Sequence, residues 1–101
     1  MDTDDLSKET RRAILFEAER FNHDLTLQFG VLSRECKDEE DYIEKSIQLI
    51  EEMKNYDEID LYDMFFGEPP KMEDFHDALR RIIENINEVK KIPIEKRTYL
   101  Y

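Results

Sequence analysis

Residues 72–92, MEDFHDALRRIIENINEVKKI, show the clearest pattern in the chain and decide its fold class. Their large apolar side chains recur with a 4-3-4-3 spacing, which places them on one side of a helix. Ala78 and Ile83 widen this stripe enough to pack against two neighbouring helices, and Pro93 prevents the helix from continuing. The spaced apolar residues are Phe75, Leu79, Ile82, Ile86 and Val89.

The composition of the whole chain also favours helices. With 101 residues the chain can form one domain around one core. Two glycines and three prolines leave few turns, which argues against a sandwich or a barrel. Because 40% of the residues are apolar, the 41% that are charged indicate a solvated surface rather than disorder.

We therefore predict an all-α fold, an antiparallel three-helix bundle in a single domain spanning residues 1–101. The long helices are expected at residues 7–36, 39–55 and 72–92. A short additional helix is expected near residues 58–66, across one end of the bundle.

Two features of the first helix remain open in the sequence. Either Thr3 or Ser7 can cap its N-terminus. Residues 25–31, LTLQFGV, fit a half-buried strand as well as a helix, and we favour the helix because no other segment alternates in this way. Gly30 costs a helix about 1 kcal/mol relative to alanine. We expect it to permit the close approach of another helix, with a kink as the alternative.

The charge is unevenly distributed. Residues 1–37 carry eight acids and six bases, residues 38–77 fifteen acids and three bases, and residues 78–101 three acids and six bases, which sum to the net charge of −11. A surface this acidic repels phosphate backbones, so we expect no direct binding to nucleic acid. A less favoured hypothesis is that the acidic middle segment mimics DNA and occupies a nucleic-acid-binding protein. In composition alone the chain is similar to small bacterial immunity, antitoxin and adaptor proteins.

The sequence indicates a cytoplasmic protein. Cys36 is the only cysteine, so no intramolecular disulfide can form. The first residues, MDTDDLSKETRR, are acidic where a signal peptide would be basic, and no apolar run is long enough to span a bilayer. We therefore expect no membrane association.

The nearest approach to a metal-binding motif is Glu73 and His76, a Glu-x-x-His pair of the kind found in di-iron helical bundles. Such a site needs a second Glu-x-x-His, and the other histidine, His23, has Arg20 at the corresponding position. Only a dimer could supply two copies of the pair. We expect a solvated surface histidine and no metal or other cofactor, and keep a dimeric metal-binding protein as the alternative function.

Enzymatic activity is the least supported class. The sequence contains no glycine-rich phosphate loop, no serine nucleophile elbow and no pair of metal-binding cysteines. Cys36 has Arg34 and Lys37 nearby, but no base is close to it in sequence.

The preferred function is a non-enzymatic protein–protein interaction module. Four of the aromatic residues lie within residues 56–66, and on one helix these and the neighbouring apolar side chains cannot all face one core. The competing interpretation is that residues 56–66 form a lid over the core and leave a few scattered apolar side chains exposed. Such lids are more common in proteins than docking patches. The candidate partner-binding residues are Tyr56, Ile59, Leu61, Tyr62, Met64, Phe65 and Phe66, together with Tyr99, Leu100 and Tyr101 at the C-terminus.

We also expect a homodimer. Three wide apolar helix faces present more surface than one small core can cover, and a two-fold contact uses one patch twice. Residues 94–101 are the expected strap, and the basic C-terminal segment would lie against the acidic middle segment of the other copy.

Overall fold

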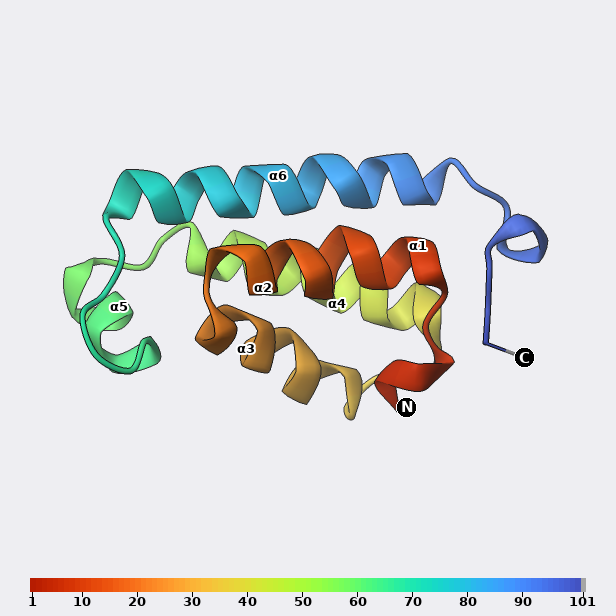
Figure 1. Cartoon of the computed structure of the whole chain (residues 1–101), viewed down its shortest axis with the longest axis horizontal. Helices are drawn as coiled ribbons and strands as arrows, with labels where there is room; N and C mark the ends of the chain where they lie inside the picture. The colour runs from red at the N-terminus through yellow and green to blue at the C-terminus, as the bar shows by residue number, and fades with distance from the viewer. Residues whose placement is uncertain (101) are drawn as a thin grey trace.

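The computed structural model describes residues 1–100, which are folded into helices and contain no strand (Figure 1). Tyr101 lies outside the described residues. The all-α prediction is confirmed for this part of the chain. In chain order the elements are η1 (Thr3–Asp5), α1 (Lys8–Arg11), η2 (Arg12–Phe16), α2 (Glu17–Phe21), α3 (His23–Ser33), α4 (Glu39–Met53), α5 (Glu58–Met64), α6 (Met72–Lys90) and η3 (Ile94–Lys96).

The last long helix, α6, matches the sequence prediction most closely. Every side chain of its spaced apolar stripe is buried, as is Ala78, while Ile83 is half-buried at the edge of the core. Regular helix ends at Lys90, slightly before the predicted residue 92, because the backbone tightens over the final turn. There the N–H of Ile92 donates to the carbonyl of Val89.

The single helix predicted over residues 7–36 is wrong, because the chain breaks at Asn22. This residue has an extended backbone, with φ of −165° and ψ of 137°. Its side chain accepts a hydrogen bond of 2.8 Å from the backbone N–H of Asp24 and so caps α3. Asparagine competes with helix continuation by bonding nearby backbone groups, which explains the break. Residues 25–31 lie within α3, so the helix was the correct alternative to a strand.

Before the break, residues 8–21 form one unbroken rod, here called the N-terminal rod. Ser7, rather than Thr3, caps it by accepting a hydrogen bond from the backbone N–H of Thr10. Its middle element, η2, is a wide π-helical turn, in which the backbone accommodates an extra residue.

Aspartate side chains cap the next two helices, and α5 is shorter than expected. Asp38 caps α4 and Asp57 caps α5, each through its side chain. Instead of reaching residue 66, α5 ends at Met64, because Phe65 adopts an extended backbone and turns its ring into the core. Gly67 then has a positive φ of 89°.

The helices pack around one core. α6 lies along the N-terminal rod and also contacts α4, while α3 folds back beneath the rod and packs against α2, η2 and α4 (Figure 1). α5 lies at one end of this arrangement, and η1 and η3 lie at the other (Figure 1).

The end that contains both chain termini is closed by a buried ion pair. The guanidinium of Arg97 donates to the carboxylate of Glu39 at 2.8 Å, and the exposed fractions of the two side chains are only 3% and 7%. Arg97 also donates to the carboxylate of Glu40 at 2.7 Å and to the carbonyl of Ile92 at 3.0 Å. The pair therefore fixes the C-terminal tail against the first turn of α4.

Glu39 is surrounded by further donors. The backbone N–H of Ser7 and the hydroxyl of Tyr99 both donate to its carboxylate. A second link joins the tail to the rod, since the N–H of Lys8 donates to the carbonyl of Thr98 at 2.7 Å. The tail thus binds its own chain, whereas the sequence suggested that it straps a second copy.

We expect Arg97→Met to lower the free energy of unfolding by about 3 kcal/mol, because it leaves the Glu39 carboxylate buried without its cation. The matched control is Arg80→Met, which removes an exposed arginine paired with Asp77 and Glu84 and should lower the free energy of unfolding far less, because exposed ion pairs contribute little. Urea unfolding measures both. Equal losses in the two variants would contradict the importance of the buried pair.

The same carboxylate predicts a sensitivity to acid. Burial by itself would raise the pKa of Glu39, but hydrogen bonds from Ser7, Arg97 and Tyr99 hold that pKa below its ordinary value of 4.5. A carboxylate with a lowered pKa stabilises the fold above its ordinary pKa, and this stability is lost as the pH falls through the folded-state pKa. The difference in unfolding free energy between wild type and Glu39→Gln should therefore shrink below pH 4.5. A difference that stays constant with pH would exclude this role.

Candidate partner-binding surface

The structure divides the predicted partner-binding residues of α5 and its flanks into an inner and an outer set. Leu61 and Phe65 are buried, and Tyr56 and Met64 pack half-buried against the core. The remaining three are exposed to solvent, with exposed fractions of 71% for Ile59, 68% for Tyr62 and 95% for Phe66.

An aromatic cluster at this end of the molecule determines which side chains face inward. The ring of Phe65 packs edge-on against Phe75 of α6 and Phe21 of α2, with centroid distances of 5.8 and 6.2 Å. Leu61, one turn earlier, is buried on the same side of α5. Ile59 and Tyr62, which are three residues apart, are left on the opposite face.

The backbone beneath the exposed side chains is held in place. The N–H of Phe66 donates to the carboxylate of Asp24 at 2.8 Å, which ties the end of this segment to α3. At its start, the side chains of Asp57 and Asp60 bond reciprocally to each other's backbone N–H groups. The apolar side chains therefore project from a fixed segment.

Acidic side chains surround these apolar ones. Glu58, Asp60 and Asp63 are exposed, and none forms an ion pair within residues 1–100. We call the exposed residues of this segment the α5 surface. Its members are Ile59, Tyr62 and Phe66, with Glu58, Asp60 and Asp63 at the rim.

Of the C-terminal candidates, Tyr99 and Leu100 lie at the opposite end of the molecule (Figure 1). Tyr99 is half-buried, and its hydroxyl donates to Glu39, so burial and this hydrogen bond raise the pKa of Tyr99 to about 12. Leu100 is exposed, and Tyr101 lies outside the described residues. The structure therefore does not bring the two predicted groups together into one surface.

The predicted metal pair is exposed in the first turn of α6. Glu73 and His76 line an open surface hollow together with Glu58, Lys71 and Met72. No group of three histidine, cysteine or acidic side chains within residues 1–100 is arranged to hold a metal ion.

Cys36 does not have the surroundings of a nucleophile. Its side chain is buried, its thiol donates to the carbonyl of Leu32 at 3.3 Å, and burial raises its pKa. Arg34 and Lys37 are neighbours in the sequence, but the net effect of the surroundings on the Cys36 pKa is an increase.

A second surface, beside α3, was not predicted from the sequence. Leu27 and Val31 point outward and are 48% and 56% exposed. Between them lies Gly30, and a Cβ atom built on it would meet no atom within 4 Å. Gly30 therefore permits no close approach within this chain, and α3 continues through it without a break, contrary to both expectations. The signal in the sequence is that residues 25–33 are its longest uncharged run.

None of the helices in residues 1–100 combines the length and apolar character needed to cross a membrane. Comparison of the chain with protein-family models, with curated proteins and with solved structures found no match. The site residues above are accordingly assigned from geometry and chemistry alone.

We expect Gly30→Ala to raise the free energy of unfolding by about 1 kcal/mol, because the added Cβ meets nothing and alanine is the better helix former. Gly67→Ala is the matched control. Its Cβ also meets nothing, but its φ of 89° should make the substitution destabilising by about 1 kcal/mol. Urea unfolding at low protein concentration measures both changes, and a destabilising Gly30→Ala would refute the assignment of open space at this position.

Proposed function

We propose that this protein is a non-enzymatic protein–protein interaction module and that the α5 surface is its contact site. The observation that supports the proposal most strongly is the exposure of Phe66, a residue that is 95% exposed although its backbone N–H is hydrogen-bonded to Asp24. Exposing a large aromatic side chain on a rigid segment provides a docking anchor at little cost in conformational entropy.

The chemistry of the rim indicates the kind of partner. A basic segment that carries at least one large apolar side chain complements an apolar centre ringed by carboxylates. Residues 38–77, which contain α5, carry fifteen acids and three bases, so their field would attract such a partner from a distance.

Two further properties belong to the proposal. We infer an antiparallel bundle, which is supported by the way α3 folds back on the N-terminal rod and by the packing of α6 along it. We infer a cytoplasmic location, which is supported by the single buried free cysteine, Cys36.

The test compares proteins captured from a cell extract by wild type and by Tyr62→Ser/Phe66→Ser. Both substituted side chains are exposed, so the fold and its thermal melt should not change. We expect a partner that binds wild type and resists about 1 M salt, where charge interactions are screened within about 3 Å. For this partner the double variant should raise the dissociation constant by at least about tenfold.

Ile94→Ser is the control, because Ile94 is also an exposed apolar side chain but lies at the other end of the molecule. Asp63→Asn tests the rim separately and should weaken binding only at low salt. A partner that binds the double variant as tightly as wild type would refute the α5 surface. Partners released fully by moderate salt would instead favour mimicry of a nucleic acid by the acidic segment.

A further inference from the structure

The outer face of α3 differs from the rest of the molecular surface. In a chain of which 41% is charged, the nine residues 25–33 carry no charge. Leu25 and Phe29 face the core, while Leu27 and Val31 face outward. A helix that is apolar on both faces is normally covered on both.

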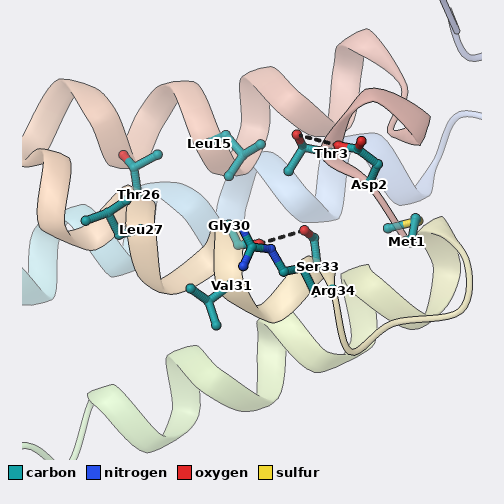
Figure 2. Close-up of a pocket in the computed structure, with 10 residues that line it drawn as sticks. All are labelled: Met1, Asp2, Thr3, Leu15, Thr26, Leu27, Gly30, Val31, Ser33 and Arg34. Carbon is teal, nitrogen blue, oxygen red and sulfur yellow. Dashed lines mark hydrogen bonds between the residues drawn. The ribbon is translucent and has the colours of Figure 1, made fainter.

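This outer face borders a hollow of about 620 Å³ between α3, the rod and the first residues of the chain (Figure 2). Leu15 comes from the rod, and Leu27, Gly30 and Val31 come from α3. Because Gly30 has no side chain, another backbone can approach α3 closely at its middle.

The charges at the two ends of α3 are opposite in sign. Arg34, just beyond its C-terminus, lines the hollow and forms no ion pair within residues 1–100. Asp24 lies in its first turn, and Glu19 lies next to His23 at 2.9 Å. Along α3 itself the face therefore has an acidic residue at one end, an uncharged apolar centre and Arg34 at the other end, where Asp2 from the start of the chain also lines the hollow.

We propose that this face binds a second copy of the same chain, with the two α3 helices antiparallel and crossing at Gly30 on a two-fold axis. In this arrangement the acidic end of each α3 lies towards Arg34 of the other copy, and the two-fold axis produces this attraction between opposite charges twice. The two helix dipoles are antiparallel, which is also favourable. Two chains of net charge −11 repel each other, and the uncharged run is where they approach with the least repulsion.

The proposal replaces the C-terminal strap expected from the sequence. Arg97, which belongs to that basic segment, is buried and paired with Glu39 of its own chain. The hydroxyl of Tyr99 also donates a hydrogen bond to this Glu39. Deleting residues 98–101 should therefore leave the dimer intact, whereas the strap would require its loss.

Light scattering after size exclusion tests the contact. Wild type should show twice the 12.3 kDa chain mass at about 100 µM, well above the micromolar dissociation constant of a weak specific dimer. Leu27→Gln/Val31→Gln should raise the dissociation constant by at least about tenfold, since each side chain contributes twice. The matched control, Ile59→Gln/Tyr62→Gln, removes side chains that are more exposed than Leu27 and Val31 but belong to the α5 surface, and it should dimerise as wild type does.

Oxidative cross-linking locates the axis. In a Cys36→Ala background, Gly30→Cys should form a disulfide-linked dimer, because residues on a two-fold axis can come within the roughly 4–7 Å between Cα atoms that a disulfide needs. Tyr62→Cys should not.

A monomeric wild type, or a dimer that survives the α3 substitutions, would overturn the proposal. So would a dimer in which Gly30→Cys does not cross-link. If wild type is monomeric and a captured protein is lost in Leu27→Gln/Val31→Gln, the face belongs to a different partner. The proposed function is tested with substitutions in the α5 surface and not in α3. The presence or absence of a dimer therefore does not decide whether the α5 surface binds a partner.

Discussion

The buried ion pair between Arg97 and Glu39 is the constraint that determines the structure at the end of the molecule where the C-terminal tail, the first turn of α4 and the start of the rod meet. A buried charge that loses its partner is expensive, so the tail, the first turn of α4 and the start of the N-terminal rod must all meet at one point. A well-packed apolar pair of the same size could be equally stable. The distinctive contribution of the ion pair is that it specifies a single arrangement, because the Glu39 carboxylate in α4 is satisfied only where donors from the C-terminal tail and from the start of the rod both reach it.

Features that depend on neighbouring residues could be predicted from the sequence. The stripe of α6 and the caps at Ser7, Asp38 and Asp57 each involve residues within a few positions of one another. The break at Asn22 escaped prediction although it is also local. The apolar stripe continues from the rod into α3, because both elements face the same core, and this continuity concealed the cap between them.

Features that depend on distant residues could not be predicted. Glu39 belongs to an acidic run that already has a sufficient explanation at a helix N-terminus, and its partner Arg97 is 58 residues away. For the same reason the composition of residues 56–66 indicated a surplus of apolar side chains without saying which ones are exposed. The positions of Phe21 and Phe75 decide that Phe65 turns inward and leaves Phe66 in water.

The π-helical turn η2 acts as a phase correction within the N-terminal rod. Thr10, Ile14 and Ala18 are all buried and follow one another at intervals of four residues. In a regular α-helix each such step carries a side chain about 40° beyond a full turn, so the three would spiral away from the core. The wider turn removes this excess rotation. As a result, the buried side chains before and after η2 point in the same direction. The half of the rod bound to the C-terminal tail and the half packed in the aromatic cluster therefore both face the core.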